Sequence, residues 1–87
     1  MTMNFKPSLC RMVIVGVDPV NNNGADVAPA VITRVWNQRE DGAWTINVKV
    51  LNDSPVTEWK TSVVLFDTEE QARQYGITGA CFWPPRS

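Results

Sequence analysis

The sequence predicts a mainly β fold: a small five-stranded, strongly bent antiparallel sheet or a partly open barrel, with one short helix before the last strand. Three observations lead to this prediction. The chain has 87 residues, enough for one domain with one core. Its apolar residues fall in short β-branched runs separated by turn residues. Helix signals occur at one place, shortly before the C-terminal end.

The first third of the chain predicts a lead-in, a strand and a long loop. Residues 1–10 are polar and contain a proline, so we expect them to be irregular. The run RMVIVGV (11–17) is apolar and β-branched, which predicts a buried strand. Residues 18–29 contain three consecutive asparagines, a glycine and two prolines, which predicts a long loop, and such loops are often functional. The sequence leaves open whether this loop is a lid, and its oxygen groups lack the alternation of a calcium-binding loop.

Three strands follow this loop. We expect them over residues 30–38, 43–52 and 58–66, with Asp41 and Gly42 forming the hairpin turn between the first two. Apolar and polar residues alternate along 43–52. This pattern predicts a sheet with one side exposed to solvent.

The C-terminal part predicts one helix and a last strand. Residues 67–76 have the signals of a short helix, in which Thr68 and Gln71 fit a capping box. Gly76 is placed to end the helix in a left-handed conformation. Residues 79–83 (GACFW) predict a short strand that stops at two prolines.

The residues for most catalytic and metal chemistry are missing. There is no histidine, which removes the usual general base and the commonest zinc ligand. Cys10 and Cys81 do not make a zinc site by themselves. The carboxylates Asp67, Glu69 and Glu70 are better explained by capping of the helix than by acid–base catalysis. We therefore expect no enzyme, no cofactor and no metal.

Charge and composition limit the partners. Eight basic and nine acidic residues give a formal charge of −1, so nucleic acid is not an expected partner. No apolar run is long enough to span a membrane, and no secretory signal is recognisable, so we expect a reduced, cytosolic protein. Four tryptophans in a chain this small favour a homo-oligomer in which part of the indole surface is covered.

Aromatic and cationic residues lie close together at three places. These are Arg34 with Trp36, Trp59 with Lys60, and Trp83 with Arg86. An indole can stack on a base and a cation can bind a phosphate, so such pairs suit a nucleotide. Neighbouring strand residues face opposite sides, which weakens the pairing of Trp59 with Lys60, whereas Thr61 shares a side with Trp59. The candidate ligand-binding residues are Arg34, Trp36, Trp59, Lys60, Thr61 and Arg86.

Two alternatives remain open for the strand that contains Arg34. If Ala30, Ile32, Arg34 and Trp36 face inward, Arg34 is a charge among apolar residues and needs a partner. If they face outward, Ile32 and Trp36 form an exposed apolar patch, which favours an interface. A third interpretation is that the tryptophans belong to the core and their basic neighbours point into solvent.

The chain also resembles a scattered group of short phage and prophage proteins. The resemblance rests on APAVITRVW, INVKVLNDSP, EWKTSVVLFDTEE and the terminal GACFWPPR, and covers most of residues 11–86. Relatives carry a histidine beside the tryptophan of ACFWPPR, and no role of that histidine transfers to this chain. The resemblance implies a virus-derived protein that works in the host bacterial cytoplasm or in the virion.

These observations together predict a noncatalytic phage accessory protein. We expect an oligomeric sponge that sequesters a nucleotide-type host immune signal. The alternative is a minor virion component, or an inhibitor that binds a host protein surface.

Overall fold

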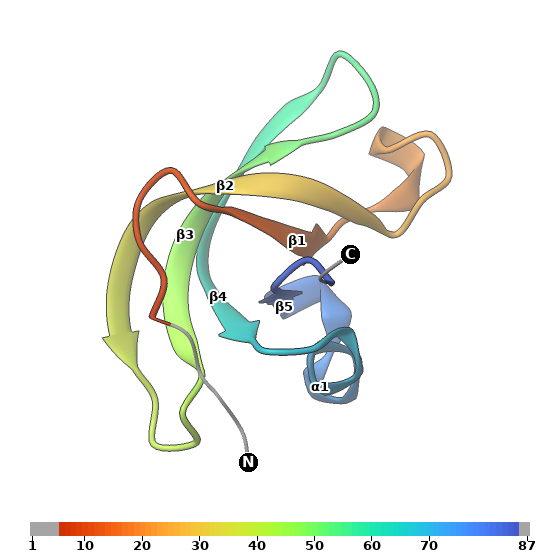
Figure 1. Cartoon of the computed structure of the whole chain (residues 1–87). Coiled ribbons are helices and arrows are strands. Elements are labelled where there is room, and N and C mark those ends of the chain that lie inside the picture. The colour runs from red at the N-terminus through yellow and green to blue at the C-terminus, as the bar shows by residue number, and fades with distance from the viewer. Residues whose placement is uncertain (1–5, 86–87) are drawn as a thin grey trace.

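The computed structural model describes residues 6–85 and shows a closed five-stranded β-barrel with a short helix before the last strand (Figure 1). The prediction of a small mainly β fold is confirmed, and the barrel closes fully. The strands and the helix are β1 (Met12–Gly16), β2 (Val27–Gln38), β3 (Trp44–Leu51), β4 (Thr57–Phe66), α1 (Glu69–Tyr75) and β5 (Ala80–Phe82). Two 3-10 turns, η1 (Pro19–Asn21) and η2 (Ile77–Gly79), lie in the connections.

Strand pairing follows the chain and then closes on itself. β1 to β4 form an antiparallel meander, and β5 completes the barrel. β5 runs antiparallel to β1 but parallel to β4. The sequence predicted an antiparallel sheet, and this one parallel pairing differs from that prediction. The connection through α1 and η2 makes the parallel pairing possible, because it carries the chain back far enough for β5 to run beside β4 in the same direction (Figure 1).

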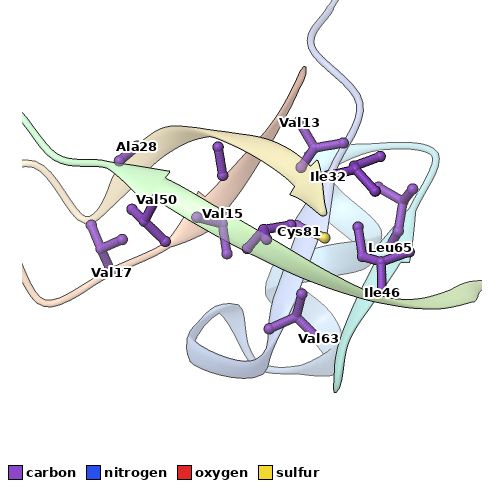
Figure 2. Close-up of a cluster of buried hydrophobic side chains, with 12 residues drawn as sticks. Val13, Val15, Val17, Ala28, Ile32, Ile46, Val50, Val63, Leu65 and Cys81 are labelled. Atoms are coloured by element: carbon purple, nitrogen blue, oxygen red, sulfur yellow. The ribbon is translucent and has the colours of Figure 1, made fainter. Parts of the chain in front are cut away.

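Apolar side chains from all five strands fill the barrel, with β5 contributing Cys81. Each large one that is fully buried contributes roughly 1.5–3 kcal/mol. The twelve core residues drawn in Figure 2 are Val13, Val15, Val17, Ala28, Ala30, Ile32, Ile46, Val48, Val50, Val63, Leu65 and Cys81. Trp44 packs against this core as well.

A smaller apolar cluster lies between α1 and the outside of the barrel. It consists of Ala72, Ala80 and Phe82, with Ile14, Val27, Phe66 and Ile77 packed against them. The helix and η2 therefore cover the outer side of β1, of β5 and of the end of β4. The outer side of β3, of the second half of β2 and of the first half of β4 remains exposed, as the accessibility of its side chains shows.

Three β-bulges lie on this exposed side, all in the strands that flank β3. β2 and β4 therefore use more residues than β3 over the same length of sheet. In β2, Thr33 and Trp36 are extra residues in the pairing with β3. In β4, Thr61 and Ser62 share the space opposite Asn47, and Ser62 has a φ of 56°. Bulges increase the local twist and redirect the side chains beside them.

The bulge at Thr33 corrects the prediction for this part of β2. Spacing by two predicted that Ala30, Ile32, Arg34 and Trp36 all face inward or all face outward. In the structure Ala30 and Ile32 are buried in the core, whereas Arg34 and Trp36 are exposed. Both alternatives are wrong as stated, because the extra residue at Thr33 reverses the side to which Arg34 and Trp36 point.

The loop between β1 and β2 is bound to the turn between β3 and β4. It is shorter than the predicted 18–29, because β2 already begins at Val27. Asn22 is only 2% exposed. Its side-chain oxygen accepts a hydrogen bond from the backbone N–H of Asp53 at 2.7 Å, and its amide nitrogen donates to the carbonyls of Ala25 in the loop and of Val27 at the start of β2. Ser54 Oγ donates to a further loop carbonyl at 2.6 Å. These contacts anchor the loop, which is a structural role for the asparagine run.

The predicted capping box is present at the start of α1. Thr68 Oγ1 accepts from the backbone N–H of Gln71 at 3.3 Å, and Gln71 Oε1 accepts from the backbone N–H of Thr68 at 3.2 Å. Gly76 ends the helix with φ 125° and ψ 103°, which is a positive φ but not the predicted left-handed helical conformation. Ala72 is fully buried and fixes the short helix to the barrel.

Candidate functional site

The exposed side of β2, β3 and β4 brings together four of the six predicted site residues. Arg34, Trp36, Trp59 and Thr61 are all exposed there, and Lys49 of β3 lies between them. We call Arg34, Trp36, Lys49, Trp59 and Thr61 the open face. Trp36 is 48% exposed and Trp59 is 62% exposed, although large aromatic side chains are usually well buried. These two indoles are therefore accessible to a ligand.

Arg34 and Trp36 form a stacked pair on this face. The guanidinium carbon of Arg34 lies 4.0 Å from the centre of the Trp36 ring, well within the range of a cation–π contact. Trp36 Nε1 donates a hydrogen bond to Asn47 Oδ1 at 2.8 Å. The indole is thus fixed by its N–H, and the guanidinium is fixed by the indole. A cation held in this way loses little conformational freedom when it binds an anion.

Asn47 connects all three strands at the centre of the open face, and the sequence interpretation missed it. Its side-chain oxygen accepts from Trp36 Nε1 and also from the backbone N–H of Ser62 at 2.9 Å. The alternation along β3 predicted Asn47 on the solvent side, and it does point outward, but only 6% of it is exposed. A polar residue between two apolar residues fits the ordinary alternation of a strand with one exposed side, so no feature of the sequence singled out Asn47.

Lys49 is the second residue that the sequence interpretation missed. It lies opposite Trp59 in the pairing of β3 with β4, and opposite Val31 in the pairing with β2. Lys60, which was predicted to be part of the site, lies opposite the buried Val48 and faces the inner side of the sheet. The structure therefore separates Lys60 from Trp59, because neighbouring residues of a strand point to opposite sides of the sheet. Lys49 is the cation that lies beside Trp59.

The third predicted pair is not seen as a pair, because Arg86 lies outside the described residues. Trp83 is half-buried against the core, and the guanidinium carbon of Arg11 lies 5.3 Å from the centre of its ring. A pocket of about 270 Å³ adjoins Trp83. Carboxylates form part of its wall, which makes it a poor site for a phosphate. Its lining residues are Asp67, Thr68, Glu69, Phe82, Trp83, Pro84 and Pro85.

Charge is distributed unevenly over the barrel. The five strands carry the cations Arg34, Lys49 and Lys60 and one carboxylate, Glu58. Among residues 6–85, none of these three cations takes part in an ion pair. The other carboxylates lie in turns, in loops and on or beside α1: Asp18, Asp26, Glu40, Asp41, Asp53, Asp67, Glu69 and Glu70. The open face is therefore locally basic on a chain of nearly neutral charge.

The perturbed titrating groups outside the open face have structural explanations. Arg73 of α1 donates to Asp26 at 3.0 Å and to Glu69 at 2.8 Å, and the hydrogen bond from Arg73 lowers the pKa of Asp26. Burial raises the pKa of the Cys81 thiol, which keeps it protonated and unreactive. The part of the chain that the structure describes contains no group of three or more potential metal ligands.

No protein-family model, no curated protein and no solved structure matches the chain. Among the described residues, no helix combines the length and apolar character needed to cross a membrane.

Proposed function

We propose that this chain is a noncatalytic binding protein whose open face takes a nucleotide-type ligand. The observation that carries the proposal is the guanidinium of Arg34 stacked on Trp36, on the same face as the exposed indole of Trp59. Stacking of a base on an aromatic side chain contributes roughly 1–3 kcal/mol. A guanidinium also matches the geometry of a phosphate, to which it can donate two hydrogen bonds.

The distribution of charge supports an anionic ligand at this face. Arg34 and Lys49 are both exposed, and the recessed pocket near Trp83 carries carboxylates instead. An anionic ligand is attracted by the first surface and repelled by the second. The open face is thus the better of the two surfaces for a phosphate.

The proposed biological setting is that of a phage accessory protein in the bacterial cytoplasm. In this setting the protein acts as a sponge that withdraws a nucleotide-type immune signal of the host. An exposed sheet surface covers one side of a ligand only. A homo-oligomer in which a second copy covers the other side would enclose the ligand and slow its release.

Calorimetry and thermal unfolding of the full chain test this function. The probes are cyclic oligonucleotides and ADP-ribose isomers, and we expect saturable heat and a raised melting temperature with at least one of them. Trp59→Ala should remove this binding while the fold remains intact, because the side chain is 62% exposed. Tyr75→Ala, at an aromatic residue on α1 that is 51% exposed, is the matched control and should bind normally. If no probe gives either heat or a thermal shift, the nucleotide proposal is wrong.

A second candidate function is binding to a host protein or to another virion protein. It is favoured by exposed aliphatic residues beside Trp59: Leu51 is 45% exposed and Val56 is 43% exposed, both near the turn between β3 and β4. Apolar side chains gathered around an indole are typical of protein interfaces. A host enzyme that co-purifies at a fixed ratio, and is lost in Leu51→Ser, would support this function over the first.

A further inference from the structure

The open face has an ordered arrangement that bears on the class of ligand. Arg34 lies opposite Asn47, and Lys49 is two residues further along β3, so the two cations are diagonal neighbours on one side of the sheet. Diagonal neighbours are about 7–8 Å apart, which long side chains can bridge. Trp36, two residues after Arg34 on β2, stacks on its guanidinium and donates its N–H to Asn47, and Trp59 lies directly opposite Lys49 on β4. In the register of the three strands the order is therefore an indole and a cation on β2, a cation on β3 and an indole on β4.

From this order we infer that the ligand is a dinucleotide, linear or cyclic, whose phosphodiester linkage lies over Arg34 and Lys49 and whose two bases lie against Trp36 and Trp59. The inference rests on the proposed nucleotide-binding function and narrows it. A mononucleotide uses one indole and one end of the diagonal, so it gains only part of the contact energy. A ligand with two bases and a phosphate linkage between them meets all four groups.

The ends of the open face argue against a longer single strand. Beyond Trp36, β2 leads into a turn that holds the exposed carboxylate of Glu40 and an ion pair between Arg39 and Asp41 at 3.2 Å, so the turn is net negative. Beyond Trp59, the turn between β3 and β4 holds the exposed Asp53. A polymer that continued past either indole would bring further phosphates close to these carboxylates, which repel them. The basic region thus has room for one phosphate linkage with a base on each side.

Lys49 and Lys60 provide a matched pair of variants for the test. Both are lysines in the central strands, but Lys49 lies on the open face and Lys60 lies opposite Val48 on the inner side. Lys49→Gln removes one of the two cations at the proposed phosphate position and preserves most of the side-chain length. Lys60→Gln removes the same charge from the chain without changing the open face. Melting temperatures of both variants show whether the fold is intact.

The experiment is calorimetric titration of the full chain with AMP, linear pApA, cyclic di-AMP, cyclic di-GMP and a ten-residue oligoadenylate at one fixed salt concentration. At least one dinucleotide should bind about tenfold or more tightly than AMP, because the second base adds a stacking contact. Lys49→Gln should weaken dinucleotide binding by about tenfold, the range of a hydrogen bond to a charged group, and Lys60→Gln by less than about twofold.

Each other outcome overturns the inference in a recognisable way. If AMP binds as tightly as every dinucleotide and Trp59→Ala abolishes its binding, the proposed function stands and the dinucleotide class is wrong. If the oligoadenylate binds more tightly than any dinucleotide, the ligand is a single-stranded polymer. If Lys49→Gln and Lys60→Gln bind alike, the phosphate does not lie where we place it. If no probe produces heat, both the class and the nucleotide-binding function fail.

Discussion

Replacement of Asn47 by leucine tests the hydrogen bonds that hold the centre of the open face. Leucine branches at the same carbon but has no acceptor, so Trp36 Nε1 and the backbone N–H of Ser62 both lose their partner. Two hydrogen bonds at about 0.5–1.5 kcal/mol each give a loss of roughly 2 kcal/mol in the free energy of unfolding. For a domain of this size, that corresponds to a fall of about 8–16 °C in melting temperature. Thermal unfolding followed by circular dichroism measures it directly.

Aspartate at position 47 is the matched variant for this prediction. It keeps an acceptor oxygen in the same place and puts a carboxylate opposite Arg34, so we expect a loss below about 1 kcal/mol. If the leucine variant melts within about 2 °C of the natural protein, the two hydrogen bonds do not stabilise the fold as argued. If the aspartate variant is as unstable as the leucine variant, the acceptor oxygen is not the important group.

Three further predictions concern the rest of the barrel. Gly16→Ala should lower the free energy of unfolding by about 1–3 kcal/mol in urea, because its new Cβ would clash with the backbone oxygen of Ile77 in η2. Gly79→Ala, with open space around it, should be tolerated. Equal stability of the two variants would contradict the close packing of η2 on β1. One thiol, that of the exposed Cys10, should react with a disulfide reagent in the folded protein at pH 8, and the buried Cys81 should react only after unfolding; two fast thiols would show that the barrel opens. Asp26→Asn should lower the melting temperature at neutral pH and have no effect at pH values well below 3.8. The reason is that a carboxyl whose folded pKa is lowered stabilises the fold above its ordinary pKa. It loses that contribution as the pH falls through the lowered value. A difference that is independent of pH would show that the ion pair with α1 is not its source.

Local signals in the sequence were sufficient to predict the separate elements of the fold. The capping box depends on Thr68 and Gln71, which are three residues apart, and the hairpin depends on the tight turn at Asp41 and Gly42. Both signals involve only residues that are close in sequence. The parallel pairing of β4 with β5 could not be predicted in the same way. It depends on where α1 returns the chain, and the contacts that decide this are distant in sequence.

The candidate site was predicted in its residue types but not in its arrangement. The sequence left open whether Trp36 and Trp59 belong to the core or to the surface, and in the structure both are exposed, with Arg34 beside Trp36 and Lys49 opposite Trp59. Lys60 was paired with Trp59 from proximity in sequence, although strand geometry assigns that place to Lys49 on the neighbouring strand. Cross-strand neighbours require the register, and the register depends on bulges that leave no clear mark in the sequence.

The same bulges bend the sheet and create the site, and this separates two groups of residues by what their substitution should do. The extra residues in β2 and β4 help these strands to curve around the barrel, and they also turn Arg34 and Trp36 outward over Asn47. Substitutions at Asn47 should therefore change stability and ligand binding together. Lys49 and Trp59 lie on regular strand positions beyond the bulges, where the side chains are exposed and little of the fold depends on them. Substitutions there should change binding alone, so a ligand that is lost from Trp59→Ala at unchanged melting temperature binds the open face itself and not a rearranged barrel.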